Sequence, residues 1–247
     1  MEKEDIKKNI EVKEPEIKTK KMKKKLKKKL PNKIIPISNP DKEFHEKWYD
    51  RRNPLNIPHP FRAVALGPPN VGKTTIVKNL ILRVKPPFEE IFVIHCDPDY
   101  TQEYDDVDAT ILDSIPAPEE WEGIVKTLVV LDDLEFKGMN KEQKRNLDRL
   151  YGFVSTHKNI SCILCSQDPF NVPPIVRRCS NLWILWRMDD MDNLATCSRK
   201  AGIKAPVMKN IFDTIMNNPK DSLWLDRTEY SPYPMRKNGF EIITKQK

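Results

Sequence analysis

The chain has 247 residues, enough for one sizeable α/β domain with appendages. Hydrophobic residues make up 38% and charged residues 32%, and the formal net charge is +7. No run approaches the roughly 20 apolar residues of a membrane span, and charge occupies the N-terminus where a secretory signal would need an apolar segment. We therefore expect an intracellular, soluble protein and not a membrane-spanning or secreted one.

The positive charge lies at the start of the chain. Residues 1–33 hold 14 Lys and 6 acidic residues, whereas residues 34–247 carry 29 basic and 30 acidic ones. This lysine-rich arm is expected to be disordered when free, and it suits a solubilising tail or localisation signal as well as a nucleic-acid contact. Residues 34–60 are rich in proline and predict an extended lead-in to a domain over residues 61–247.

A phosphate-binding loop opens the domain. Residues 61–67, FRAVALG, predict a strand, and residues 73–84 predict a helix. The loop between them, GPPNVGKT, fits the pattern G-x-x-x-x-G-K-[ST], whose backbone N–H groups surround phosphate at a helix N-terminus. We expect Lys73 to reach the β- and γ-phosphates and Thr74 to bind Mg²⁺. The expected nucleotide contacts are Gly67, Pro68, Pro69, Asn70, Val71, Gly72, Lys73, Thr74 and Thr75.

A later strand ends in two carboxylates. After a strand at 90–96 and an acidic stretch with a short strand at 110–112, residues 127–133, TLVVLDD, have the form of a Walker B strand. Asp132 is the predicted metal-side residue. Asp133 stands where the carboxylate that orients the attacking water is expected, although a helix cap or loop carboxylate has the same pattern.

The order of these elements bears on the class of enzyme. The strand at 90–96 lies between the loop helix and Asp132, and an inserted strand favours ATP-hydrolysing motors over GTPases and small-molecule kinases. The guanine signature N-K-x-D is absent from the sequence, since Asn140-Lys141 is followed by Glu-Gln. We therefore expect ATP and Mg²⁺ as cofactors.

The next helix and strand supply a third polar group. Asn140 and Gln143 form a plausible cap for a helix over 141–157, and ISCILCSQ predicts a strand at 160–167. Gln167, at the end of that strand, is expected to sense the γ-phosphate or to position water. Cys162 and Cys165 have C-x-x-C spacing, but a strand points positions three apart to opposite faces, which argues against a zinc or redox site.

Two arginines follow on a short helical turn. Arg177 and Arg178 are candidates for an arginine finger inserted into a neighbouring subunit, and surface ion pairing is an equally good interpretation.

The C-terminal third continues the alternation. Residues 181–186 predict a strand that buries Trp183 and Trp186, and helices are predicted over 189–201 and 206–217. SLWLD at 222–226 and FEIIT at 240–244 are expected to close the sheet as a hairpin at its edge. The whole pattern predicts an α/β fold with a mainly parallel sheet flanked by helices.

Taken together, GPPNVGKTT, LVVLDD, ILCSQD and the element P-P-x-x-R-R-x-x-N resemble the FtsK–HerA superfamily over about residues 60–230. The likeness is to its viral branch, the genome-packaging ATPases of nucleocytoplasmic large DNA viruses, virophages and Polinton-like elements. Asp133 departs from the Glu of many relatives, and the lysine-rich arm is not a family motif.

This resemblance implies a RecA-like P-loop core, a ring of subunits (hexamer or pentamer) and translocation of double-stranded DNA into a preformed capsid. It also implies a capsid or portal protein as partner and a location in a viral factory or virion. Basic residues just beyond the Asp pair are candidates for phosphate-backbone contacts: Lys137, Lys141, Lys144 and Arg145.

Two other functions are compatible with the sequence. One is a nucleotide-gated adaptor or switch that hydrolyses ATP slowly while the basic arm tethers a partner. The other is a P-loop nucleoside kinase, for which the sequence shows no arginine-bearing lid.

Overall fold

The computed structural model describes residues 57–228 and 231–244. The lysine-rich arm and nearly all of the proline-rich lead-in lie outside the described residues, so the predictions made for them stay predictions. Within the described part, no helix combines the length and the apolar composition needed to cross a membrane.

The described residues form a nine-stranded sheet with the order β3-β2-β4-β5-β1-β6-β7-β8-β9. From β3 to β6 neighbouring strands are parallel, and from β6 to β9 they are antiparallel. The mainly parallel α/β fold predicted from the sequence is confirmed. The strands are Arg62–Leu66 (β1), Glu90–His95 (β2), Thr110–Leu112 (β3), Thr127–Asp132 (β4), Ile160–Ser166 (β5), Leu182–Trp186 (β6), Ser222–Asp226 (β7), Met235–Lys237 (β8) and Glu241–Ile242 (β9).

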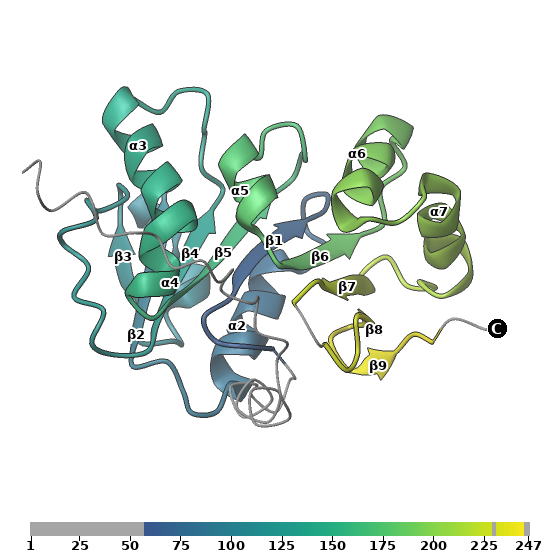
Figure 1. Ribbon diagram of the computed structural model, residues 1–247, viewed down its shortest axis with the longest axis horizontal. Helices are drawn as coiled ribbons and strands as arrows, with labels where there is room; N and C mark the ends of the chain where they lie inside the picture. Colours follow the sequence, from purple (N-terminus) through teal and green to yellow (C-terminus); the bar gives the residue numbers. More distant parts are fainter. Residues whose placement is uncertain (1–56, 229–230, 245–247) are drawn as a thin grey trace, which may run out of the picture. The chain divides into compact units, whose positions relative to one another are not determined.

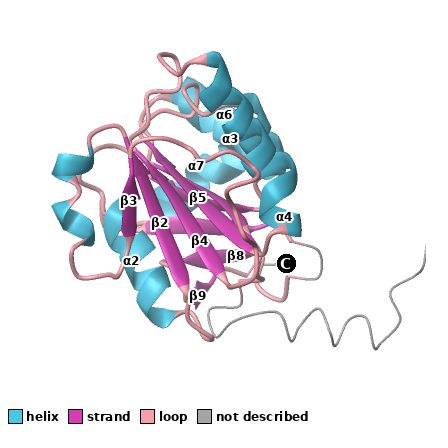
Figure 2. Cartoon of the chain, turned by 90° about the vertical axis from the view of Figure 1, so that its left-hand side faces the viewer, coloured by secondary structure: helices cyan, strands magenta, loops and turns pink. Residues whose placement is uncertain are grey.

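Helices cover both faces of this sheet. The α-helices are Lys73–Arg83 (α2), Lys141–Arg149 (α3), Ser155–His157 (α4), Pro174–Cys179 (α5), Met191–Ala201 (α6) and Ala205–Thr214 (α7). In Figure 1, α2 lies on one side of the strands and α3, α4 and α5 on the other, and Figure 2 shows the sheet between these two layers.

The two faces of the sheet bury separate apolar clusters. One cluster contains Cys162 and Trp183 with residues of α3, α5, α6 and α7, and the other contains Cys165 and Trp186 with residues of α2. The predicted burial of both tryptophans is confirmed. The two cysteines lie on opposite faces, as alternation along a strand requires.

The strand that separates β1 from β4 in space is β5. The strand at 90–96, which interrupts the motifs in sequence, pairs with the far side of β4 instead. Consequently the carboxyl end of β5, with Gln167 just beyond it, lies between the carboxyl ends of β1 and β4.

The predicted helix over 141–157 contains a π turn at Leu150–Val154, between α3 and α4. Its start is capped as expected, since Asn140 Oδ1 accepts a hydrogen bond from the Gln143 N–H at 2.8 Å. The Gln143 side chain does not return to Asn140. It binds the backbone N–H and carbonyl of Ile115, at 2.6 and 3.3 Å, and so fixes the helix to the segment after β3.

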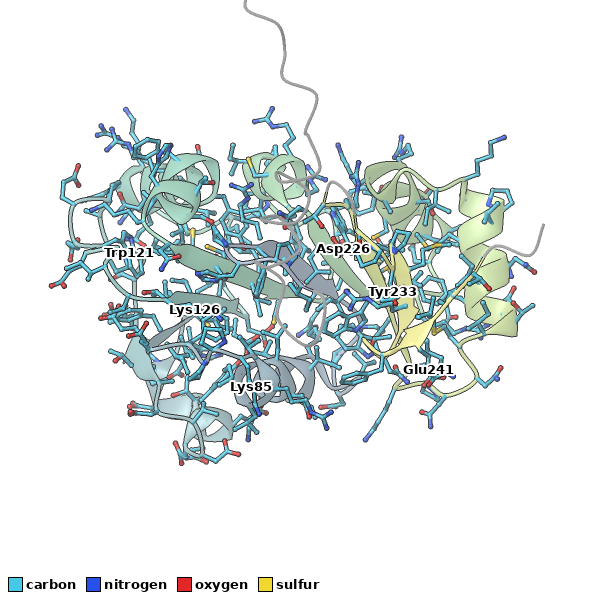
Figure 3. All side chains as sticks on the ribbon, turned by 60° about the horizontal axis from the view of Figure 1, so that its bottom comes forward. Lys85, Trp121, Lys126, Asp226, Tyr233 and Glu241 are labelled. Carbon is cyan, nitrogen blue, oxygen red and sulfur yellow. The ribbon has the colours of Figure 1, made fainter. Side chains whose placement is uncertain are left out.

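The expected hairpin between 222–226 and 240–244 is wrong. β7 pairs with β8, and β8 pairs with β9 through the turn at Asn238 and Gly239, whose φ angles are 51° and 80°. β8 has only three residues and follows a proline, so its sequence pattern is too short to predict a strand. The Asn-Gly pair after it, however, is a strong signal for a hairpin turn. Asp226, Tyr233 and Glu241 mark this region, on the opposite side of the molecule from Trp121 and Lys126 (Figure 3).

Candidate nucleotide-binding site

The phosphate-loop pattern forms a tight connection between β1 and α2. Asn70 and Gly72 have φ angles of 61° and 100°, in the region that glycine and asparagine tolerate best. A Cβ built on Gly67 would lie 2.8 Å from the Cβ of Trp186, closer than real Cβ atoms approach. The loop therefore needs its first glycine for packing against β6 and its second for backbone direction.

The N-terminus of α2 presents its polar backbone without a protein cap. Among the described residues, no side chain caps this end of the helix, and its first turn contains no acidic residue. The first intrahelical bond is donated by the N–H of Ile76 to the carbonyl of Gly72. The preceding N–H groups and the positive end of the helix dipole suit a phosphate anion.

Lys73 lies folded over the loop. Its Nζ donates to the carbonyls of Gly67 and Pro68 at 2.9 and 2.8 Å, and the residue is buried. The ammonium is thus held at the first turn of α2, where incoming phosphate oxygens would compete with these two carbonyls.

Asp132 ends β4 as a buried carboxylate. The hydroxyl of Tyr104 donates to its Oδ2 at 2.7 Å. Burial raises the pKa of Asp132, the Tyr104 hydrogen bond lowers it, and the negative charge of Asp133 raises it again. Burial, followed by the charge of Asp132, raises the pKa of Tyr104, so its hydroxyl stays protonated and able to donate.

Asp133 and Gln167 are exposed and lie at the ends of β4 and β5. Asp133 has a positive φ of 46°, which turns the chain out of the strand at that residue. Both side chains line the cavity described next and also a second hollow beside it.

A cavity of about 420 Å³ collects these groups. It brings together nine of the predicted site residues: Pro69, Asn70, Gly72, Lys73, Thr74, Thr75, Asp132, Asp133 and Gln167. Gly67 and Pro68 contact the site through Lys73, while Val71 packs against the core beneath α2. The Thr74 hydroxyl and the Asp132 carboxylate supply hard oxygen ligands of the kind that Mg²⁺ prefers, so the donor set fits that metal.

Five lining residues lie outside the sequence motifs: His95, Thr101, Glu103, Tyr104 and Lys220. His95 ends β2, Thr101 lies between the 3₁₀ turns Pro98–Tyr100 and Gln102–Tyr104, and the next two belong to the second turn. The acidic stretch after β2 shows neither a helix nor a strand pattern. Because it follows a parallel strand, however, it must begin at the carboxyl edge of the sheet, where ligands bind in such folds. Lys220 precedes β7, and nothing in its local sequence indicated a ligand contact.

The two arginines do not reach this cavity. Arg177 and Arg178 lie on α5, as predicted, but neither is among the described residues that line it. Arg177 instead lines an apolar groove of about 400 Å³ together with Phe136, Phe170 and Lys144. Within the described residues the Arg177 Nε is buried without a hydrogen-bond partner.

Comparisons with known proteins agree with this geometry. The family model of the ATPase family associated with various cellular activities (AAA) matches residues 63–189, which include the loop, Asp132, Asp133, Gln167 and both arginines. Among curated proteins, none matches the chain.

Three similar solved structures are of the genome packaging NTPase B204 from Sulfolobus turreted icosahedral virus 2. Its complex with sulfate has 16% identity and a TM-score of 0.54, covering 76% of this chain and 99% of that one. The complex with ATP-gammaS has 15% identity and a TM-score of 0.54, with 74% and 99% covered. The complex with AMPPCP has 16% identity and a TM-score of 0.50, with 68% and 93% covered. At these identities the similarity shows a shared fold.

Proposed function

Because the chain belongs to the AAA family of ATPases, we propose that it binds and hydrolyses ATP in this cavity and uses the reaction to move double-stranded DNA. The observation that carries the proposal is the convergence of three strand ends on one cavity. The loop after β1, the carboxylates after β4 and Gln167 after β5 all line it.

The chemistry assigned to the site follows from where each group lies. Lys73 and the N–H groups of α2 would hold the β- and γ-phosphates, and Thr74 and Asp132 would hold Mg²⁺, which neutralises phosphate charge when bound. Asp133 would orient the attacking water, and Gln167 would contact the γ-phosphate from β5.

A neighbouring subunit would complete the site. Since Arg177 and Arg178 lie away from their own chain's cavity, one of them could stabilise transition-state charge only in another subunit. In the proposed ring of several copies, a hexamer or pentamer, such an arginine would enter the site of the next subunit.

The finer assignment is genome packaging. We propose that the ring moves DNA into a viral capsid, with a capsid or portal protein as partner and a viral factory or virion as its location. The motif resemblance to the viral FtsK–HerA branch supports this, as does the fold shared with a protein named as a genome packaging NTPase. Basic residues around the start of α3 are the proposed DNA contacts: Lys137, Lys141, Lys144 and Arg145.

The test is phosphate release by the assembled full chain, with and without linear double-stranded DNA. DNA should stimulate turnover at low salt, and the stimulation should fall steeply as salt rises, because phosphate contacts release counterions. Lys73→Met should abolish turnover, and Lys204→Met, which changes an exposed lysine outside the cavity, should not.

Other outcomes support the alternatives. A correctly assembled oligomer whose turnover ignores DNA at low salt contradicts the translocase. Slow hydrolysis with a single turnover per binding event supports the nucleotide-gated switch, and transfer of the γ-phosphate to a nucleoside supports the kinase.

A further inference from the structure

Lys220 enters the nucleotide cavity from a part of the chain that the family match does not include. It lies in the connection between α7 and β7, beyond residue 189, and lines the same cavity as Lys73 and Thr74. Its side chain is exposed, and its ammonium group forms no ion pair with any of the described residues.

The connection that carries Lys220 is built as a fixed turn. The N–H of Lys220 donates to Oδ1 of Asn218, and the N–H of Asn218 donates to Oδ2 of Asp221, both at 2.9 Å. Asp221 is in turn bound by Lys237 at 3.0 Å and by the Asn238 amide at 2.9 Å, so β8 and its turn support the same carboxylate. The backbone position of Lys220 is therefore set before any ligand binds.

Trp186 ties this turn to the phosphate loop. Its indole Nε1 donates to the carbonyl of Lys220 at 3.2 Å, while its Cβ is the atom against which Gly67 packs. Trp186 ends β6, the neighbour of β1 on the side away from β4. Lys220 therefore lies beside the start of the loop, on the opposite side of β1 from the carboxylates.

This arrangement gives the two ends of the cavity different chemistry. Asp132, Asp133 and Gln167 lie on the β4 and β5 side of the loop, where the metal and the terminal phosphate are needed. A triphosphate held across the N-terminus of α2 with its γ-phosphate on that side must extend its sugar toward β6 and β7. Lys220, which lines the cavity and whose carbonyl is bound by Trp186, lies on that side.

We propose that Lys220 binds the α-phosphate and ribose end of the nucleotide. It would contact the part of the ligand that ATP, ADP and AMP share, whereas Lys73 contacts the β- and γ-phosphates. The assignment rests on the proposed ATP binding, and it makes the C-terminal antiparallel strands part of the nucleotide site.

The two lysines can be separated by calorimetric titration of the full-length protein with ATP, ADP and AMP, using competition against ATP-gammaS for weak ligands. Lys220→Met should weaken all three by a similar factor, about tenfold, as expected for the loss of a charge-assisted hydrogen bond. Lys73→Met should weaken ATP and ADP and leave AMP unchanged. Lys220→Arg should retain most of the wild-type affinity for the three nucleotides. Lys204→Met should bind all three as tightly as wild type does.

The outcomes are distinct. If wild type binds ATP but Lys220→Met binds AMP as tightly as wild type does, the inference is wrong while the proposed function stands. If Lys220→Met weakens ATP and ADP but not AMP, Lys220 contacts the terminal phosphates, and the proposed orientation of the nucleotide is wrong. If wild type binds none of the three nucleotides, the proposed function itself fails. An unchanged melting temperature of the Lys220→Met protein without ligand would show that its losses are not due to unfolding.

Discussion

Tyr104 donates its hydroxyl to Asp132 at 2.7 Å, so a 3₁₀ turn beyond β2 fixes the orientation of the carboxylate assigned to Mg²⁺. Both residues are buried. Outer-shell hydrogen bonds of this kind orient metal ligands, and their loss commonly costs 10- to 100-fold in metal affinity or activity (about 1–3 kcal/mol).

Tyr104→Phe should therefore raise the Mg²⁺ concentration needed for half-maximal ATP hydrolysis by about tenfold. Affinity for ATP without Mg²⁺ should be unchanged, because the lost hydroxyl bonds the carboxylate assigned to the metal. Calorimetry with and without Mg²⁺ checks this without relying on turnover. Tyr151→Phe is the matched control, since that tyrosine is buried on the other face of the sheet. Identical Mg²⁺ curves for Tyr104→Phe and wild type would contradict the role.

Alanine should destabilise the protein at Gly67 but not at Gly152. A Cβ at Gly67 would collide at 2.8 Å with a Cβ that cannot swing aside, so Gly67→Ala should lower the free energy of unfolding by about 1–3 kcal/mol. At Gly152 the nearest atom is Ile175 Cδ1 at 3.8 Å, and Gly152→Ala should not lower it. Urea denaturation of both variants measures the difference. Equal free energies of unfolding for the two variants would contradict the prediction, because they would show that the structure around Trp186 shifts to make room for the new Cβ at residue 67.

The arginine finger can be found by mixing subunits. Alanine at the finger should lower turnover by a factor on the order of 10³, and mixing with Asp133→Asn subunits should restore part of it, because each supplies what the other lacks. Arg177→Ala and Arg178→Ala are tested separately, and the rescued variant identifies the finger. If neither loses activity, surface ion pairing is the better interpretation of both.

His59 should make stability depend on pH. Its ring binds Ser161 Oγ and Asn159 Oδ1 at 2.8 and 2.9 Å, and burial, with the charge of Lys126, lowers its pKa to about 4 from 6.5. Between pH 6.5 and about 4, His59 is protonated in the unfolded chain but stays neutral in the folded protein. The free energy of unfolding therefore falls as the pH falls. The slope is at most about 1.4 kcal/mol per pH unit and ends near pH 4.

His59→Gln keeps a donor and an acceptor but cannot titrate. Urea midpoints measured from pH 7.5 to 4.5 should fall less steeply for this variant than for wild type. Parallel curves would show that His59 does not carry the dependence.

The motifs allowed much of the site to be predicted. Lys73, Thr74, Asp132, Asp133 and Gln167 were expected from a loop pattern and from polar residues at strand ends, and they line one cavity because parallel strands share a carboxyl edge. Their relative order in the sheet was not predictable, since strand order depends on packing between distant segments. The placement of β5 between β1 and β4 is such a case.

The remainder of the site comes from segments without periodicity. Tyr104 lies in an acidic stretch, and its role depends on the fold of two 3₁₀ turns. Lys220 depends on a turn stabilised by Asp221, which is held in turn by Lys237 of β8 and by Asn238 in the turn after it. In both cases the local sequence shows no helix or strand pattern, and tertiary hydrogen bonds determine the conformation.

The π turn at Leu150–Val154 has an evolutionary consequence. A π turn holds about one residue more than an α turn, because its hydrogen bonds run from i to i+5. Deleting Gly152 would restore a regular helix, but it would rotate α3 by about 100° relative to α4. Gln143 would then be carried away from Ile115, and the start of α3, with Lys141 and Lys144, would face a new direction. A one-residue change at this turn could thus redirect the basic surface while the nucleotide site stays intact.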